Sequence, residues 1–226
     1  MVGGVVLAGG RSRRMGRPKA TLEWHGSTFV RRVSGLVARV ADGPVVVVRA
    51  PGQELPELPF EVVEDAREDE GPLQGIAAGL AALRGRAEIA YVSAVDVPLL
   101  DPKFVRRVVE AVGDADAAAP AGPQPLAAAY RVELADTAER LLAEGERRAR
   151  ALLEHARVNW LYEPGPESVD DPEAYEAARA RPAPLVTFDG RHVRAATLGA
   201  LLPEADDPEL PLVDGDVVQV TRSEPV

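Results

Sequence analysis

Short valine-rich runs alternate with amphipathic segments along most of the chain, and this alternation restricts the fold more than any other feature of the sequence. The runs are apolar on both faces that a strand presents, which is typical of the interior strands of a parallel sheet. Strands that alternate with helices favour a sheet covered by helices on both faces. The sequence therefore predicts an α/β fold, a Rossmann-like three-layer sandwich with a mostly parallel sheet.

The periodicity of apolar residues predicts where the elements of this sandwich lie. Strands are expected at residues 3–7, 45–48, 60–64, 89–95, 117–120 and 126–131. Helices are expected at residues 28–40, 74–83, 102–112, 134–144, 149–155 and 172–181. Asp101 is the expected N-cap of the third helix, because Pro102 after it suits a first helical position.

A segment of different character begins at the Pro-Ala-Pro step of residues 182–184. Short strands are expected at 186–188, 191–193 and 217–221, separated by Asp-Gly pairs that are typical of hairpin turns. We therefore divide the chain into a domain over residues 1–181 and a small β-rich C-terminal extension over residues 182–226, of unknown role. Few contacts are expected to cross the boundary. The apolar residues of the extension still need burial, on the domain, within a β unit or on a partner; they are Leu185, Val186, Phe188, Leu198, Leu201 and Leu202.

Composition excludes several kinds of partner and site. The chain has no cysteine, which rules out disulfides, thiolate metal sites and cysteine nucleophiles and agrees with a reducing cytoplasm. Its net charge of -10 disfavours binding to nucleic acid or to an acidic membrane surface. No basic leader precedes the first apolar run, and no apolar stretch approaches the roughly 18 residues that span a bilayer. We expect a soluble, cytoplasmic protein without nucleic-acid or membrane partners.

A basic cluster lies directly after the first expected strand and the turn Ala8-Gly9-Gly10. It consists of Arg11, Arg13, Arg14, Arg17 and Lys19, with no acidic residue among them. In parallel sheets, ligands bind beyond the carboxyl ends of the strands, where glycine turns let backbone N–H groups approach phosphates. The cluster therefore predicts a site for a small polyanion, and a solvated positive face is the alternative. Neither the Walker pattern nor G-x-G-x-x-G is present.

The run L-A-G-G-R-S-R-R-M-G-R-P-K, residues 7–19, resembles the signature of the sugar-nucleotide-transferase-like superfamily, and within it that of the molybdenum cofactor guanylyltransferases. Further similarities follow in the family's order, at Val63-Glu64-Asp65, Gly71-Pro72-Leu73-Gln74-Gly75-Ile76, Asp96-Val97-Pro98, Gln124-Pro125-Leu126, Gly145-Glu146-Arg147-Arg148 and Ser168-Val169-Asp170-Asp171-Pro172. The resemblance covers about residues 3–180 and leaves out the extension. Pro18 departs from the family's usual aspartate, and Val48 or Arg49 replaces a base-proximal asparagine found in some relatives.

The resemblance implies a nucleotidyltransferase with the nucleotide-diphospho-sugar transferase type of fold. Such an enzyme transfers GMP from GTP to the phosphate of molybdopterin, releases pyrophosphate and uses Mg²⁺. GTP is expected to contact Leu7, Ala8, Gly9, Gly10, Lys19, Asp65, Gly71, Pro72, Leu73 and Asp96. The expected catalytic residues are Lys19, Arg14 and Asp96, with Asp96 as the metal ligand. Molybdopterin is expected against Arg147, Arg148 and Asp170, and transient contacts with other molybdenum-cofactor proteins are a further expectation.

The residues taken one by one leave alternatives open. Asp96 or Asp170 could cap a following helix, and Asp170 could bind either metal or the pterin. Asp65, which could read the guanine, could instead be a strand-end turn residue, and Arg147 and Arg148 could close a helix end. The three histidines, His25, His155 and His192, are expected to be surface or packing residues. Two functions compete with guanylyl transfer: the same transfer with CTP in place of GTP, and a non-catalytic nucleotide-binding module that regulates cofactor delivery. Because all these residues precede residue 182, the extension is expected to be dispensable for the chemical step.

Overall fold

A computed structural model describes residues 1–10, 14–65, 71–122 and 124–220 of the chain. Its central sheet consists of β1 (Val2–Leu7), β4 (Val45–Arg49), β5 (Glu61–Glu64), β6 (Ile89–Ala94), β7 (Ala117–Pro120), β8 (Ala127–Arg131) and β9 (Val158–Leu161). The strand order is β5-β4-β1-β6-β8-β7-β9, and β8 runs antiparallel to both of its neighbours while the other pairs are parallel. The predicted mostly parallel sheet is confirmed.

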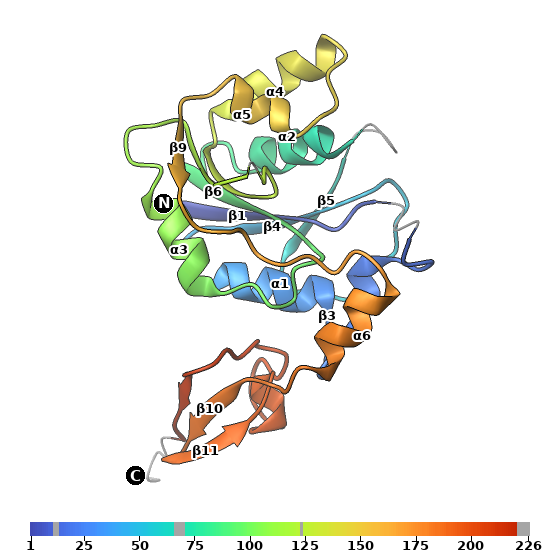
Figure 1. The fold of residues 1–226 in the computed structure, drawn as a ribbon, viewed down its shortest axis with the longest axis vertical. Helices are drawn as coiled ribbons and strands as arrows, with labels where there is room; N and C mark the ends of the chain where they lie inside the picture. Colours follow the sequence, from blue (N-terminus) through green and yellow to red (C-terminus); the bar gives the residue numbers. More distant parts are fainter. Residues whose placement is uncertain (11–13, 66–70, 123, 221–226) are drawn as a thin grey trace.

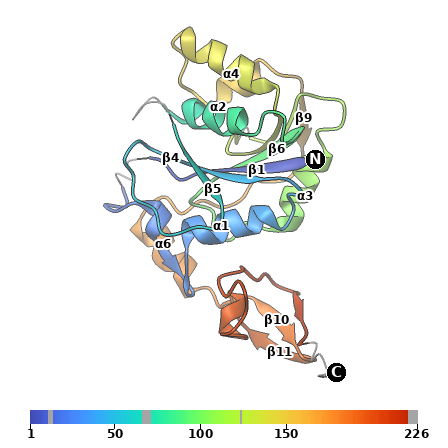
Figure 2. The same cartoon turned by 180° about the vertical axis from the view of Figure 1, so that it is seen from behind.

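Helices cover both faces of this sheet (Figures 1 and 2). They are α1 (Phe29–Ala38), α2 (Pro72–Ala82), α3 (Pro102–Glu110), α4 (Leu134–Ala143), α5 (Arg150–Glu154) and α6 (Pro172–Ala180). Successive strand residues point to opposite faces, so Val6 and Val47 pack in one core with α1, α3 and α6. Val5 and Val46 pack in a second core with α2, α4 and α5. The three-layer α/β sandwich expected from the sequence is therefore confirmed.

Local capping chemistry explains where several helices begin. Thr28 caps α1, whose first residue is Phe29 rather than the expected Thr28, because its hydroxyl accepts a hydrogen bond from the Arg31 amide. Asp101 caps α3 through the Lys103 amide at 2.8 Å, as the sequence predicts. The expected core strands begin and end within one residue of the observed strands, and the expected helices begin and end within two residues of the observed helices.

The sequence prediction missed two regions of β structure in the domain. One is β9, an edge strand whose Trp160 side chain is 45% exposed, so that it lacks the continuous apolar run of an interior strand. The other is the hairpin of β2 (Glu23–Trp24) and β3 (Ser27–Thr28), whose strands are too short to show a period. Its turn places His25 and Gly26 at positive φ.

The C-terminal extension forms a small sheet of β10 (Leu185–Phe188), β11 (Arg191–Arg194) and β12 (Val217–Val218), with a short 3₁₀ helix, η2 (Leu198–Ala200). β10 and β11 make the expected hairpin. β12 is shorter than the expected strand, whose last residue, Thr221, lies outside the described residues.

The extension packs against α1 (Figure 1). Arg31 forms an ion pair with Asp207, and both guanidinium N–H₂ groups of Arg39 donate to Asp216. A Cβ on Gly35 would lie 2.6 Å from the ring of Pro211, so the two surfaces are in close contact. The expectation that few contacts cross the boundary is therefore wrong.

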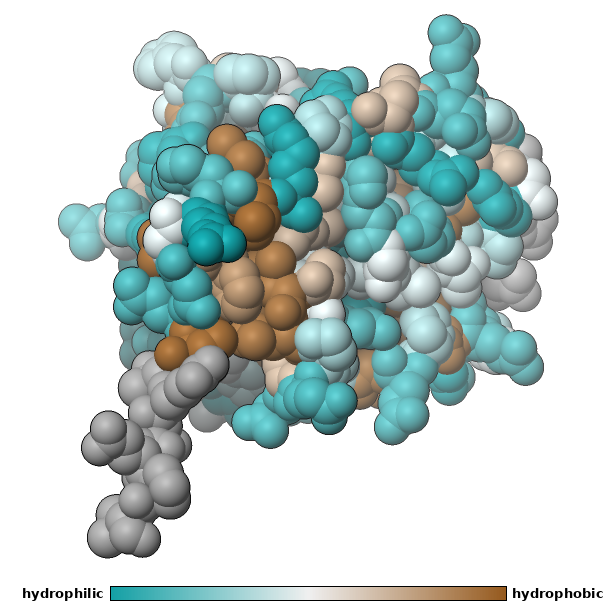
Figure 3. Space-filling view, turned by 90° about the horizontal axis from the view of Figure 1, so that it is seen from below, coloured by the Kyte–Doolittle hydropathy of each residue, from teal (hydrophilic) through white to brown (hydrophobic). Residues whose placement is uncertain are grey.

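The apolar residues of the extension differ in burial. Val186 is 1% exposed, whereas Leu185 and Val217 are 41% and 65% exposed. Figure 3, which views the molecule from this end, shows hydrophobic residues gathered on one part of the surface. Among the described residues, no helix combines the length and apolar character needed to cross a bilayer.

Candidate functional site

A cavity of about 680 Å³ lies beyond the carboxyl ends of β4, β1 and β6. The two strands that follow β1 in the sheet, β4 and then β5, lie on one side of it, whereas the next strand, β6, lies on its other side. The strand order therefore reverses at β1, and such a switch point is where ligands bind in open α/β sheets. The Ala8 amide donates to the Val48 carbonyl at 2.8 Å, and a Cβ on Gly9 would lie 3.2 Å from the Ala50 nitrogen. The glycine turn is thus held against the end of β4, with its backbone open to the cavity.

Most of the predicted GTP-binding residues meet at this cavity. Those that line it are Leu7, Ala8, Gly9, Gly10, Lys19, Asp65, Gly71, Pro72 and Asp96. Leu73 is the exception, because its side chain is fully buried in the core under α2. Its amide donates to the Arg147 carbonyl at 3.4 Å, and a contact of Leu73 with GTP stays a prediction.

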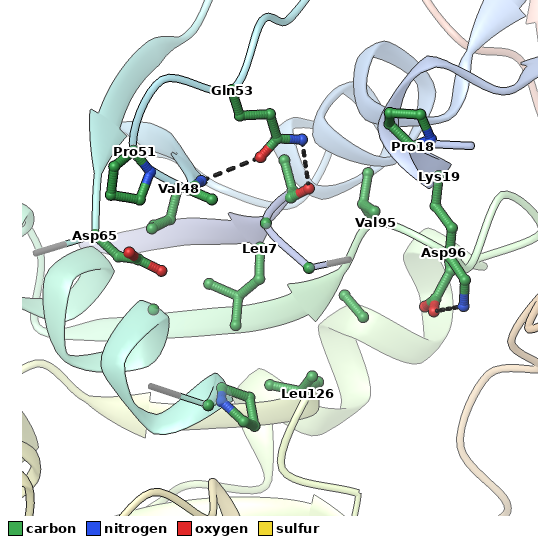
Figure 4. Close-up of a pocket in the computed structure, with 18 of the residues that line it drawn as sticks. Leu7, Pro18, Lys19, Val48, Pro51, Gln53, Asp65, Val95, Asp96 and Leu126 are labelled. Atoms are coloured by element: carbon green, nitrogen blue, oxygen red, sulfur yellow. Dashed lines mark hydrogen bonds and ion pairs between the residues drawn. The ribbon is translucent and has the colours of Figure 1, made fainter. Parts of the chain in front are cut away.

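Lys19 lies beside Asp96 at one end of the cavity (Figure 4), and its ammonium also forms an ion pair with Asp170. It begins the 3₁₀ helix η1 (Lys19–Thr21), and its Nζ is 2.7 Å from both Asp96 Oδ2 and Asp170 Oδ1. The side chains of Lys19 and Asp96 are only 14% and 17% exposed. Burial by itself lowers the pKa of Lys19, but its hydrogen bonds with Asp170 and Asp96 outweigh that effect and raise the pKa above the ordinary value. A firmly protonated cation therefore lies at the end of β6.

Asp170 belongs to the segment before α6, and two contacts hold that segment beside the turn of Asp96. The Val169 amide donates to the Asp96 carbonyl at 2.8 Å, and the Ser168 hydroxyl donates to Asp170 at 2.7 Å. Hydrogen bonds from Lys19 and then from Ser168 keep the pKa of Asp170 below its ordinary value, and the charge of Arg14 adds to this. Arg14 is exposed and does not line the cavity, so it acts on this group through its field.

The two carboxylates are the residues that could hold a divalent metal. Among the described residues, no group of three or more histidine, aspartate or glutamate side chains forms a metal cluster. Mg²⁺ does not require one, since it binds through one or two carboxylates and keeps water and phosphate oxygens as its other ligands. The Lys19 ammonium shows that Asp96 and Asp170 can share a cation.

Asp65 and Gln53 lie toward the other end of the cavity (Figure 4). Asp65 directly follows β5, and its amide donates to the Arg49 carbonyl at 2.9 Å. The side-chain amide of Gln53 donates to the Ala8 carbonyl at 2.9 Å and accepts from the Ala50 amide at 3.1 Å. It therefore joins the loop after β4 to the glycine turn. The sequence analysis missed Gln53, and its place in a Pro-Gly-Gln loop after a strand was the available signal.

Arg147 and Arg148 are engaged in local structure. The Arg147 guanidinium donates to the carbonyl of Leu142, in the last turn of α4, at 2.9 Å and to that of Glu146, after the helix, at 2.8 Å. Arg148 pairs with Glu146 at 2.6 Å, and its hydrogen bond is the main cause that lowers the pKa of Glu146 to about 2. These positions support the helix-end alternative, and binding of molybdopterin by the two arginines stays a prediction.

The remaining predicted positions lie away from the cavity or outside the described residues. His25, His155 and His192 do not line the cavity, and each has a ring nitrogen within 3.4 Å of a neighbouring oxygen, as expected of packing or surface residues. Arg11 and Arg13 of the basic cluster lie outside the described residues.

Comparisons with known proteins agree with this geometry. A family model described as the MobA-like NTP transferase domain matches residues 4–160. A probable molybdenum cofactor guanylyltransferase of Mycobacterium avium (strain 104) is 40% identical over 158 residues, which cover 67% of this chain and 80% of the relative. The chain belongs to the MobA-like NTP transferase family. The resemblance noted in the sequence is confirmed, and the chain is a nucleotidyltransferase.

Another relative in sequence is the probable molybdenum cofactor guanylyltransferase of Mycobacterium tuberculosis (strain ATCC 25618 / H37Rv), 42% identical over 160 residues that cover 67% of this chain and 78% of the relative. Solved structures share the fold. Molybdopterin-guanine dinucleotide biosynthesis protein A from Archaeoglobus fulgidus superposes with a TM-score of 0.61 at 22% identity, covering 78% of this chain and 96% of that one. Rv0371c from M. tuberculosis H37Rv superposes with a TM-score of 0.63 at 20% identity, covering 80% and 98%.

The matched range of the MobA-like family does not take in the whole site. Every residue that lines the cavity lies within residues 4–160. Asp170, α6 and the extension lie beyond that range, although Asp170 contacts Lys19 directly. One of the two acidic partners of Lys19 is therefore supplied from outside the matched range, and the other, Asp96, lies within it.

Proposed function

We propose that this chain transfers GMP from GTP to the phosphate of molybdopterin, giving the guanine dinucleotide form of the cofactor and pyrophosphate. The observation that carries the proposal is the Lys19 cation between Asp96 and Asp170, beside a glycine turn at the switch point of the sheet. The names of relatives at 40% and 42% identity support guanylyl transfer in particular.

The cavity suggests how GTP would lie. The guanine would occupy the end formed by Asp65 and the loop of Gln53, where the carboxylate could accept hydrogen bonds from the guanine N1–H and exocyclic amine. The triphosphate would pass the turn of Gly9 and Gly10 and reach Lys19, whose positive charge offsets that of the phosphates. This orientation keeps the base and the reacting phosphorus at opposite ends, as the residues in Figure 4 are arranged.

The chemistry needs positioning and charge neutralisation more than acid–base catalysis. An oxygen of the molybdopterin phosphate would attack the α-phosphorus of GTP. A new P–O bond would form as the bond to the bridging oxygen of the departing pyrophosphate breaks. The attacking phosphate is already an anion, so no general base is required, in agreement with the position of all three histidines away from the cavity. Lys19 would stabilise the charge that develops, with Arg14 acting from outside the cavity.

We further propose that Mg²⁺ is the metal. Asp96 would hold it, with Asp170 as the second carboxylate at the position that the Lys19 ammonium occupies. Oxygen ligands in this number suit Mg²⁺, which would neutralise charge on the phosphates. One structure of Rv0371c from M. tuberculosis, similar in fold, is a complex with manganese. Small-molecule substrates are the proposed partners, with transient contacts to other molybdenum-cofactor proteins, and the cysteine-free composition fits a cytoplasmic location.

A turnover assay tests the function directly. Purified chain with Mg²⁺ and molybdopterin is expected to release pyrophosphate with GTP, and at least about tenfold more slowly with CTP at equal concentration, since a site that pairs with base donors discriminates against their absence. Equal rates with CTP would contradict the guanine assignment. Tight GTP binding without any pyrophosphate would favour a non-catalytic binding module instead.

Gln53→Ala is expected to raise KM for GTP with little change in kcat. The substitution removes the two hydrogen bonds that join the loop to the glycine turn, each of which contributes about 1 kcal/mol. Because water can replace part of this contribution, GTP binding should weaken about threefold to tenfold. Steady-state kinetics measure the effect. Glu54→Ala is the matched control, because Glu54 is the exposed neighbour and does not line the cavity. A change in kcat without a change in KM would show that Gln53 does not support the binding of GTP.

A further inference from the structure

Arg32 is a buried cation whose partners come from three separate parts of the chain. It lies on α1 and is 2% exposed. Among the described residues, its guanidinium contacts carbonyl oxygens and the ring of Trp24, 4.1 Å away, rather than a carboxylate. Burial lowers the pKa of Arg32 to about 9, and the charge of Arg39 adds to the effect. A buried charge without a counter-ion is costly, so its position calls for a reason beyond packing.

One partner belongs to the turn that carries Asp96. Nε of Arg32 donates to the Pro98 carbonyl at 2.6 Å. Pro98 ends the Asp96-Val97-Pro98 turn, which has two further tethers: the Leu100 amide donates to Val97 at 3.0 Å, and the Val169 amide donates to Asp96 at 2.8 Å. Arg32 thus supplies a hydrogen bond from α1 to this turn, in addition to the apolar packing between them.

The other partners belong to the C-terminal extension. The terminal nitrogens of Arg32 donate to the carbonyls of Ala196 at 3.2 Å and Leu212 at 3.4 Å. These two residues are held together, because the Leu212 amide donates to the Ala196 carbonyl at 2.8 Å. The extension therefore completes the set of acceptors that a planar guanidinium needs when it is removed from water.

We propose that Arg32 is a positioning residue that couples the C-terminal extension to the turn of Asp96. The extension fixes the guanidinium, and the guanidinium fixes the Pro98 carbonyl, so the Asp96 carboxylate is presented rigidly at the end of β6. This gives the extension a role in the chemical step and opposes the expectation that it is dispensable. The inference rests on the proposed function of Asp96.

Within the part of the chain that the structure describes, two other arginines of α1 contact the extension without contacting the turn of Asp96. They therefore separate the effect of holding the extension on α1 from the effect of positioning the turn. Arg31 and Arg39 also bind the extension, through Asp207 and Asp216. None of their described contacts reaches the turn of Asp96. A variant at Arg39 therefore removes that residue's own contacts with the extension and keeps all three carbonyl acceptors of Arg32.

The test compares Arg32→Met, Arg32→Lys and the control Arg39→Met in the full chain. Amide hydrogen exchange followed by NMR reports on the turn through the Leu100 and Val169 amides, and turnover is measured against Mg²⁺ concentration. In Arg32→Met we expect these amides to exchange about tenfold faster, since loss of one tether promotes local opening. We also expect kcat to fall by about tenfold or more, with a higher Mg²⁺ concentration at half-maximal rate. Arg32→Lys should be intermediate, because an ammonium cannot bridge all three carbonyls.

Arg39→Met is expected to lower the thermal midpoint while leaving exchange at both amides and the Mg²⁺ dependence within about twofold of the wild type. If the Arg32 variants behave like this control, Arg32 is a packing residue and the proposal is overturned. Arg32→Lys decides by the same criteria if Arg32→Met does not fold. The exchange measurement needs no substrate, so a wild type that is inactive with GTP would refute the proposed function without deciding the coupling.

Discussion

Replacing Asp96 with asparagine is expected to lower turnover by a factor on the order of 10²–10³ without unfolding the chain. The substitution keeps the shape of the side chain and an oxygen that can accept from Lys19. It removes the negative charge that would hold the metal at the end of β6, where Asp96 is 17% exposed. Asp170 still neutralises Lys19, at 2.7 Å, so no buried cation is left without a partner. The loss should therefore appear in rate rather than in folding.

Asp101→Asn is the matched control for this experiment, because Asp101 lies in the segment that follows the same turn, caps α3 and does not line the cavity. Asparagine is as good an N-cap as aspartate, so the control should keep both its thermal midpoint and its turnover. Pyrophosphate release and a thermal melt measure the two properties for each variant. An Asp96→Asn enzyme with near wild-type turnover would take Asp96 out of the mechanism.

The parts of the site that the sequence predicted correctly are those set by short stretches of chain. A buried strand followed by Ala8-Gly9-Gly10 leaves few conformations for the backbone, so the position of the turn follows from local pattern. Asp96 could be placed in the same way, at the end of an apolar run. Since parallel strands end at one edge of the sheet, the two segments had to meet.

Contacts between distant segments could not be predicted in this way. Lys19 and Asp170 are 151 positions apart, and no periodicity indicates that their side chains share an ion pair. The link from Arg32 to Leu212 spans 180 positions and depends on how the extension docks. A buried arginine on an amphipathic helix departs from the apolar pattern, so the pattern predicts α1 but not the reason for Arg32.

Arg147 illustrates a different difficulty. Its sequence context is compatible both with a ligand contact and with closure of a helix end, because both use the same guanidinium donors. The structure places those donors on one carbonyl in the last turn of α4 and one just after the helix. The backbone of the same residue has a second role, since a Cβ on Gly71 would lie 2.6 Å from its carbonyl oxygen. The conformation of this segment therefore shapes the loop at the start of α2, whatever the side chain binds.

Lys19→Met is expected to have the second large effect, a loss of turnover on the order of 10²–10³ together with weaker GTP binding. Methionine keeps the length and the apolar stem of lysine but removes the charge that would face the phosphates. Lys103→Met is the matched control, because Lys103 is exposed on α3 and does not line the cavity. That control should keep wild-type kinetics.

The same substitution should change how the site binds metal in the absence of nucleotide. In the wild type the Lys19 ammonium occupies the position between Asp96 and Asp170, so a metal ion must compete with it. Without Lys19 no ammonium separates the two carboxylates, and their repulsion favours a cation that binds between them. Lys19→Met should therefore bind Mg²⁺ or Mn²⁺ more tightly than the wild type, although it turns over far more slowly.

The titration of Asp170 gives an independent check of this arrangement. The hydrogen bond from Lys19 is the largest cause that keeps the pKa of Asp170 below its ordinary value. In Lys19→Met the pKa should rise, so Asp170 should protonate at a higher pH, and the gain in metal affinity should disappear as the pH falls through that range. Calorimetry with Mn²⁺ at several pH values, beside NMR titration of the carboxyl carbons, measures both effects. A Lys19→Met variant that binds metal no better than the wild type at neutral pH would show that Asp96 and Asp170 do not form one cation site.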